Sequence, residues 1–173
     1  MKPRVFGVSL VCCVASCAVP PAEIRSGPFN DVTITQAQQQ NLVGQRVRWG
    51  GDIARVTPGR ERTCFEVVGR PLTREARPRA GDETDGRFIT CAPGFYDPTV
   101  YEHGRQLTVI GTLEEAEVGK IGDFEYHYPR IAGEKLYLWP QREPAMAAYA
   151  PWANPYGEPY QGPWTFGPWG YWW

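Results

Sequence analysis

The sequence predicts an all-β fold: a small antiparallel barrel of about five strands, with a short helix before it. Apolar and polar residues alternate in several segments, which is the period of a half-buried strand. Glycine- and proline-rich turns separate these segments, and no strong helical periodicity lies between them. Closing the strands into a barrel removes the exposed edges that an open sheet would have to protect.

The first strand is predicted to start at residue 45, where Val47, Trp49 and Ile53 share one face. Gly50 and Gly51 interrupt the pattern, as glycines do where a strand bends or bulges on its way around a barrel. The other predicted strands show the same alternation and comprise residues 63–68, 87–92, 106–113, 124–128 and 136–139.

A helix over residues 36–43 is predicted from two signals at its ends. The stretch from Thr35 to Gln38 has the spacing of a capping box, and Gly44 lies where a glycine often follows the last helical turn. The helix would lead directly into the first strand.

Residues 1–16 are predicted to be a signal peptide. Lys2 and Arg4 precede an uncharged run that is too short to span a bilayer. The small residues before Cys17 resemble the lipobox of bacterial lipoproteins, so acylated Cys17 would become the mature N-terminus and anchor the chain to membrane lipid. Ala18 follows where Asp would direct inner-membrane retention, which favours the outer membrane of a Gram-negative bacterium. The alternative is an ordinary cleaved signal that leaves Cys17 as a thiol.

Two cysteines remain for the folded domain, Cys64 and Cys91, because the other three belong to the signal and the lipid site. An exported chain is in an oxidising setting, where two remaining cysteines favour a disulfide. A hairpin whose loop spans residues 70–86 would place Cys64 opposite Cys91. The alternative is two buried thiols that never meet.

The chain is predicted to contain a tether over residues 17–34, one barrel domain over 35–142 and a low-complexity tail over 143–173. The mature chain of 157 residues suits one core. It keeps 16 of the 18 basic residues and all 19 acidic ones, so its net charge is −3. This balance argues against a nucleic-acid partner.

The tail is predicted to be extended or disordered, since its prolines forbid a regular helix. Its exposed rings would contact a membrane interface, a sugar face or another protein, with peptidoglycan and outer-membrane proteins as the expected partners. The alternative is that the rings fold back over the open end of the barrel. The expected contacts are the aromatic residues that follow prolines: Trp152, Tyr156, Tyr160, Trp164 and Trp169.

The residue inventory argues against an enzyme. The mature chain has one serine, Ser26, in the predicted tether, so a Ser-His-Asp arrangement within the barrel is unavailable. His103 and His127 lack the spacing of metal ligands, and acidic residues clustered in loops are usually solvated. We therefore predict no catalytic residue, no metal and no cofactor.

Several stretches share their order and spacing with a known family, namely residues 42–51, 93–98, Gly111-Thr112, 119–122 and 138–140. Over about residues 35–142 they resemble the Slp family of outer-membrane lipoproteins. The resemblance implies an OB-like β-barrel on a lipid anchor, an association with carbon starvation and stationary phase, and no established catalytic activity. The cysteine pair and the aromatic tail look like departures from the usual pattern of the family.

A ligand-binding barrel is the alternative function, because OB-like barrels often hold an oligosaccharide or a peptide on an open face. Arg46, Arg48 and Trp49 lie beside the double glycine, and with Arg70 and Arg87 they could form a face for an anionic envelope glycan. The simpler interpretation places Trp49 in the core and leaves the arginines solvated.

Overall fold

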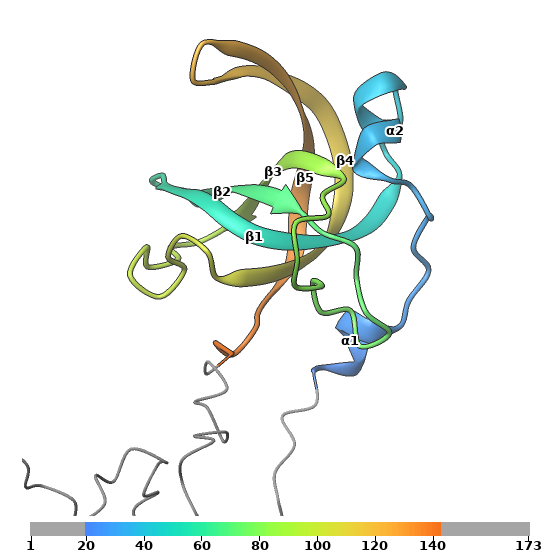
Figure 1. The fold of residues 1–173 in the computed structure, drawn as a ribbon, viewed down its shortest axis with the longest axis vertical. Coiled ribbons are helices and arrows are strands. Elements are labelled where there is room, and N and C mark those ends of the chain that lie inside the picture. The colour runs from blue at the N-terminus through green and yellow to red at the C-terminus, as the bar shows by residue number, and fades with distance from the viewer. Residues whose placement is uncertain (1–19, 143–173) are drawn as a thin grey trace, which may run out of the picture. The chain divides into compact units, whose positions relative to one another are not determined.

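The computed structural model describes residues 20–142, which form a closed five-strand barrel with two short helices (Figure 1). The strand order around the ring is β1-β2-β3-β5-β4. This arrangement confirms the predicted all-β, OB-like fold class. The elements are α1 (Ala22–Arg25), α2 (Ile34–Gln39), β1 (Arg46–Pro58), β2 (Arg62–Gly69), β3 (Gly86–Pro93), β4 (Gln106–Ile121) and β5 (Phe124–Leu138).

One seam of the barrel is parallel, so the sheet is mixed and not purely antiparallel. Four pairings are antiparallel, whereas β3 and β5 run in the same direction over three residue pairs. The reason is topological: strand direction cannot alternate all the way around a ring with an odd number of strands. The parallel seam is also the shortest, and this leaves backbone groups on either side of it in need of other partners.

The double glycine lies where β1 changes neighbours. Gly51 pairs with Leu107 of β4 and with Gly69 of β2, so the first half of β1 belongs to one pairing and the second half to the other. A Cβ on Gly51 would lie 1.9 Å from the carbonyl oxygen of Val68. The backbones therefore approach too closely for any side chain at this position, as the predicted bend requires.

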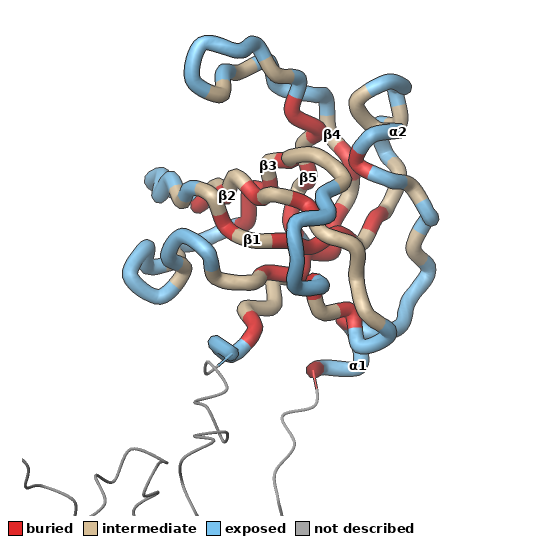
Figure 2. The backbone as a smooth tube through the Cα atoms, viewed as in Figure 1, coloured by how far each residue is buried: buried red, intermediate tan, exposed pale blue. Residues whose placement is uncertain are grey.

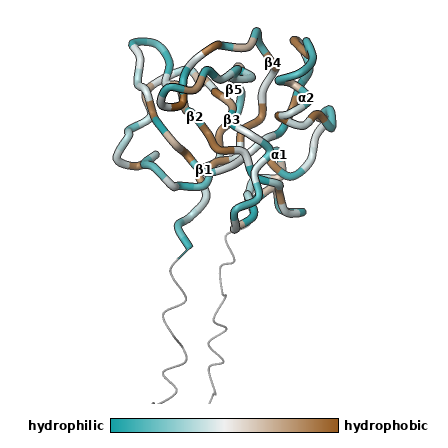
Figure 3. The backbone as a smooth tube through the Cα atoms, turned by 45° about the horizontal axis from the view of Figure 1, so that its top comes forward, coloured by the Kyte–Doolittle hydropathy of each residue, from teal (hydrophilic) through white to brown (hydrophobic). Residues whose placement is uncertain are grey.

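The core fills the barrel with the inward-facing residues of all five strands (Figure 2). Trp49 is 6% exposed and meets the ring of Phe88 edge-on at 5.3 Å. Ile34 of α2 enters the same cluster, and Tyr96 and Tyr101 pack partly buried against it. Hydrophobic residues concentrate on the strands, whereas the loops are more hydrophilic (Figure 3).

Helix α2 is shorter than predicted and starts earlier. Thr33 is the N-cap: its side chain accepts a hydrogen bond from the Gln36 amide at 3.1 Å, while the Gln36 side chain accepts one from the Thr33 amide at 2.9 Å. This capping box precedes the predicted one by two residues. Gly44 has φ +87° in the turn before β1, separate from the helix end at Gln39.

Strands β4 and β5 form a hairpin longer than the sequence predicts. Residues 124–128 and 136–139 appear as separate strands in the sequence, but β5 runs continuously from Phe124 to Leu138. The outer part of the hairpin projects beyond the ring (Figure 1).

Neither helix in residues 20–142 is long and apolar enough to cross a membrane.

Candidate functional site

A polar network bridges the barrel where the β3–β5 pairing ends. The two strands pair only from Ile89 to Cys91 on β3 and from Arg130 to Ala132 on β5. Beyond this seam the backbone N–H of Arg87 donates to the hydroxyl of Tyr126 at 2.8 Å. A side chain of β5 thus replaces the backbone partner that a longer seam would have supplied.

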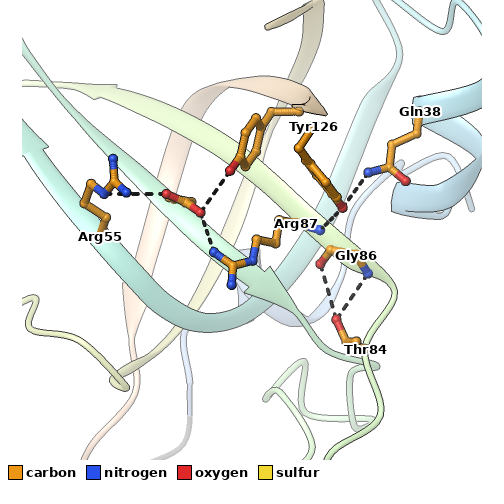
Figure 4. A network of polar contacts seen from close by, with 8 residues as sticks. Gln38, Arg55, Thr84, Gly86, Arg87 and Tyr126 are labelled. Carbon is orange, nitrogen blue, oxygen red and sulfur yellow. Dashed lines mark hydrogen bonds and ion pairs between the residues drawn. The ribbon is translucent and has the colours of Figure 1, made fainter. Parts of the chain in front are cut away.

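Glu66 lies at the centre of this network, on the outer face of β2. Figure 4 shows the network, with Arg55, Arg87 and Tyr126 labelled. The Glu66 side chain is 11% exposed, and its carboxylate accepts hydrogen bonds from Arg87 at 2.6 Å and from the Tyr128 hydroxyl at 3.2 Å. The guanidinium of Arg55 lies 3.7 Å away. Residues of β1, β2, β3 and β5 therefore converge on one carboxylate whose charge is compensated by two cations.

The tyrosines extend the network to α2. The side-chain amide of Gln38 donates to the Tyr126 hydroxyl at 2.6 Å, and the rings of Tyr126 and Tyr128 lie 4.7 Å apart. Burial, followed by the neighbouring Glu66 carboxylate, raises the pKa of Tyr128 above its ordinary value. Tyr128 therefore remains a neutral hydrogen-bond donor at physiological pH and is unsuited to act as a base.

Cys64 and Cys91 are joined by a disulfide between directly opposed residues of β2 and β3. The guanidinium of Arg130 lies beside it, with one nitrogen 3.7 Å from the Cys91 sulfur. The same guanidinium pairs with Glu117 at 2.8 Å and with Glu114 at 3.6 Å. Arg130 thus links the disulfide to the acidic side of the β4–β5 hairpin.

The polar groups of this region are engaged with one another and do not surround a free reactive atom. Across residues 20–142, no group of three or more histidine, cysteine or acidic side chains is arranged to hold a metal ion. Ser26 is exposed and donates to the carbonyl of Ala22, and His127 lies 3.8 Å from Glu125 on the exposed hairpin. His103 is exposed in the turn before β4.

The predicted ligand face is divided between the inside and the outside of β1. Trp49 points into the core and donates its indole N–H to the carbonyl of Val32 at 2.7 Å. Arg46 pairs with Glu134 at 2.9 Å on the outside. This hydrogen bond is the main cause of a lowered pKa at Glu134.

Arg48 binds the chain segment before the barrel. Its guanidinium donates to the carbonyls of Ile24 and Arg25, at 3.1 and 2.6 Å, and lies 5.0 Å from the ring centre of Phe29. Residues 20–34, which the sequence predicts to be part of a tether, therefore pack along the barrel. Ile24, 2% exposed, is buried in a small cluster there. We call this packed segment, residues 20–34, the N-terminal clamp.

One hollow does bring several predicted ligand-face residues together. It has a volume of about 270 Å³ and lies between the clamp, β1 and the loop that follows β2. Arg48, Trp49 and Arg70 line it, with Asp31 and Asp85 as acidic neighbours. Arg46 and Arg87 do not line it. Arg70 pairs with Asp52 at 2.9 Å.

Wider hollows of about 520 and 600 Å³ lie on the outside of the barrel near the disulfide, and they share Arg62 and Glu114. Their charged residues have both signs, so they do not form a focused site for one ligand charge. Cys17 and the five tail aromatics lie outside the described residues. Their predicted roles therefore remain predictions.

The sequence analysis did not assign the Glu66 network or the clamp. For Glu66, the usable signal was a lone acidic residue on the polar face of an apolar strand. Phe29 was the corresponding signal in the clamp, as an isolated aromatic among prolines and polar residues.

Comparison with known proteins gives a family match over almost the whole chain. The model of the outer membrane lipoprotein Slp family matches residues 14–173. The match is longer than the resemblance seen in residues 35–142, and it includes both the aromatic tail and Cys17.

Three bacterial relatives agree with this match. The outer membrane protein Slp of Escherichia coli K12 is 27% identical over 87% of this chain and 81% of its own length. An uncharacterized Haemophilus influenzae protein is 30% identical over 80% of this chain and 76% of its own length. The uncharacterized lipoprotein YeaY of E. coli K12 is 31% identical over 66% of this chain and 61% of its own length.

Among solved structures, the mitochondrial single-stranded DNA-binding protein Rim1 of S. cerevisiae covers 58% of this chain and 99% of its own, at 11% identity and a TM-score of 0.36. A likeness at this level carries no functional conclusion.

Proposed function

Because the chain belongs to the outer membrane lipoprotein Slp family, we propose that it is a non-catalytic envelope protein anchored through acylated Cys17. Its role is to connect the outer membrane with a neighbouring envelope component, in a context of starvation or stationary phase. The observation that carries this proposal is the N-terminal clamp. A chain packed from residue 20 onward keeps the barrel within a few residues of the anchor.

The absence of catalysis in this proposal is supported by how the ionisable groups are used. The Glu66 carboxylate at the centre of the network is paired with Arg55 and Arg87 and accepts a hydrogen bond from Tyr128. A general acid or base needs a free path to a substrate proton. Slp is, moreover, not a known enzyme family.

The anchor is tested by Cys17→Ser in the full chain, followed by membrane fractionation. We expect the wild-type protein in the outer-membrane fraction and the variant released from it, because the acyl chains supply the membrane affinity. His127→Ala is the matched control and should fractionate like the wild type. Retention of Cys17→Ser in the outer membrane would contradict the proposed anchor.

The connecting role is tested by cosedimentation with purified peptidoglycan sacculi. The mature chain without its lipid is compared with a chain that stops after Arg142 and therefore lacks the aromatic tail. Binding that disappears on truncation supports contact with the cell wall through the tail. No binding by either chain contradicts a cell-wall partner and leaves outer-membrane proteins as the class to examine.

A second function, binding of a small anionic glycan or peptide, is favoured by the 270 Å³ hollow beside Arg48 and Arg70. It predicts saturable binding of soluble muropeptides by the mature chain and loss of that binding in Arg70→Ala. Arg60→Ala, on the exposed β1–β2 turn, should leave it unchanged. Absence of saturable binding by the unsubstituted chain rejects this second function.

A further inference from the structure

The anchor must lie close to one particular end of the barrel. Only two residues separate Cys17 from Pro20, which is buried and begins the described chain. Three Cα–Cα steps span at most about 10 to 11 Å even when fully extended. An acylated Cys17 would therefore hold Pro20 within about that distance of the membrane surface, and α1 begins two residues further along the chain.

The clamp carries this constraint into the barrel. Ile24 of α1 packs against Ala76, in the loop after β2, and against Ile110 of β4. Arg48 binds the last two carbonyls of α1, and Lys135 pairs with Glu23. Helix α1 is thus held by side chains of β1, β4 and β5 and by the loop after β2. The position of the anchor therefore also constrains which part of the domain faces the lipid.

The surface around α1 is basic. Near α1, the exposed basic residues are Arg25, Arg74, Arg79 and Lys135, and the exposed acidic residues beside them are Glu23 and Glu75, a net charge of +2. Ile24 of α1 packs against Ala76 of the loop after β2, so Arg25 and Arg74 lie on neighbouring segments. Hydrogen bonds from its own backbone amide and from Thr73, followed by the charges of Arg74 and Arg25, lower the pKa of Glu75.

The far end of the barrel has the opposite charge. Residues 114–127 of the β4–β5 hairpin contain five acidic residues and one lysine, a net charge of −4 with neutral histidine. The hairpin projects at the end of the barrel opposite α1 (Figure 1). The basic end of the domain is thus the end near the proposed anchor, and the acidic end lies opposite it.

We propose that the α1 end of the barrel is a membrane-contact surface that binds anionic lipid headgroups through Arg25, Arg74 and their basic neighbours. The proposal rests on lipid anchoring at Cys17, as set out under the proposed function. The lipid phosphates attract the arginines, while repulsion directs the acidic hairpin away from the membrane. The barrel is thereby held in one orientation, with the hairpin available to other envelope components.

The test uses the mature chain from Ala18 to Trp173, without lipid, and vesicles of phosphatidylethanolamine with or without phosphatidylglycerol. Each arginine near an anionic surface contributes about 1 kcal/mol, or about fivefold in partitioning. We therefore expect the double variant R25Q/R74Q to bind anionic vesicles about 25-fold more weakly than the unsubstituted chain. Binding should also fall as salt is added, because the surface charges are screened.

The matched control is R60Q/R62Q, which removes two exposed arginines, Arg60 in the β1–β2 turn and Arg62 at the start of β2. It has the same charge change and the same tail, and it should bind within about twofold of the unsubstituted chain. An equal loss in both double variants would mean that net charge alone governs binding, and would overturn the assigned surface. No preference of the unsubstituted chain for anionic vesicles would overturn it as well.

The vesicle assay does not depend on the anchor, because the chain tested lacks Cys17. If headgroup binding fails while Cys17→Ser still releases the protein from the membrane, only the contact surface is rejected. If headgroup binding is observed but Cys17→Ser stays in the outer membrane, the anchor is rejected and the contact surface remains as a peripheral binding site.

Discussion

Replacing Arg48 with alanine should release the N-terminal clamp without unfolding the barrel. The guanidinium donates two hydrogen bonds to α1 carbonyls and lies over the ring of Phe29. Hydrogen bonds from a charged donor contribute about 1.5 kcal/mol or more each, and an exposed cation–π contact about 0.5 kcal/mol. Water recovers part of this at a half-exposed site, so we expect a net cost of about 2 kcal/mol, or about thirtyfold in the opening equilibrium.

Amide hydrogen exchange measures this opening directly, because several clamp amides have known partners, and two of them serve as probes. The amide of Ser26 donates to Ala22 and that of Asn30 donates to Arg46. In Arg48→Ala both should exchange about thirtyfold faster, while Val47, inside the barrel, should keep the protection set by global unfolding. Phe29→Leu, which removes the ring but leaves the hydrogen bonds, should accelerate exchange by no more than about threefold.

The control for Arg48→Ala is Arg60→Ala, on the exposed turn between β1 and β2. It should leave the exchange of Ser26 and Asn30 unchanged. The reasoning would be refuted if Arg48→Ala also left both amides at wild-type rates. It would be refuted equally if Val47 lost as much protection as the clamp, since clamp and barrel would then open as one cooperative unit.

Three further perturbations test the barrel itself. Replacing Cys64 and Cys91 with serine should lower the free energy of unfolding by about 3.5 kcal/mol in the chain-entropy model, measured by urea denaturation beside the oxidised wild type. Glu66→Gln removes a carboxylate that faces two arginines, so it should cost about 2 kcal/mol, and wild-type stability in the variant would contradict the compensated charge. The hydrogen bond from Arg46 lowers the pKa of Glu134, so the ionised carboxylate stabilises the fold at pH values above the ordinary carboxyl pKa. This stabilisation is lost as the pH falls through the pKa of Glu134 in the folded protein. An NMR titration of Arg46→Ala should show the Glu134 pKa rising toward its ordinary value.

Much of the barrel could be predicted because alternation is a local signal. Val47, Trp49 and Ile53 identify the inward face of β1 from the sequence alone, and all three are buried. The parallel seam follows from counting strands in a closed ring, although sequence patterns alone do not show which pair closes it. The extent of β5 was underestimated because Pro129 and Gly133 interrupt the alternation, whereas in the structure both are accommodated within the strand.

At the start of α2, tertiary packing determines which of two equivalent capping sequences is used. The capping-box spacing occurs twice, at Thr33 with Gln36 and at Thr35 with Gln38. Only the first is used. It makes Ile34 the first helical residue, and Ile34 is buried in the barrel at 3% exposure. The apolar contact decides the register, and the cap follows from it.

The clamp could not be predicted because its hydrogen bonds use backbone carbonyls. The side chains of Arg48 and Trp49 bind the carbonyls of Ile24, Arg25 and Val32, groups that every residue possesses. The segment therefore shows no alternation and no motif, and its prolines and glycine are equally typical of a flexible linker and of a packed segment. The Glu66 network is hidden for a related reason, since its members come from separate strands and meet only in three dimensions.

Docking of the clamp changes what a lipid anchor can do. On a flexible linker of 18 residues, a domain would sample distances of about 20 to 25 Å from its anchor and every orientation. With residues 20–34 bound to the barrel, the proposed anchor at Cys17 would be joined to the domain by two residues, and it would then restrict orientation as well as location. A protein that joins two envelope layers benefits from this restriction, since a fixed orientation raises the effective concentration of its outer surface at the second layer. Arg48→Ala should therefore weaken contact with a partner even where the lipid is intact.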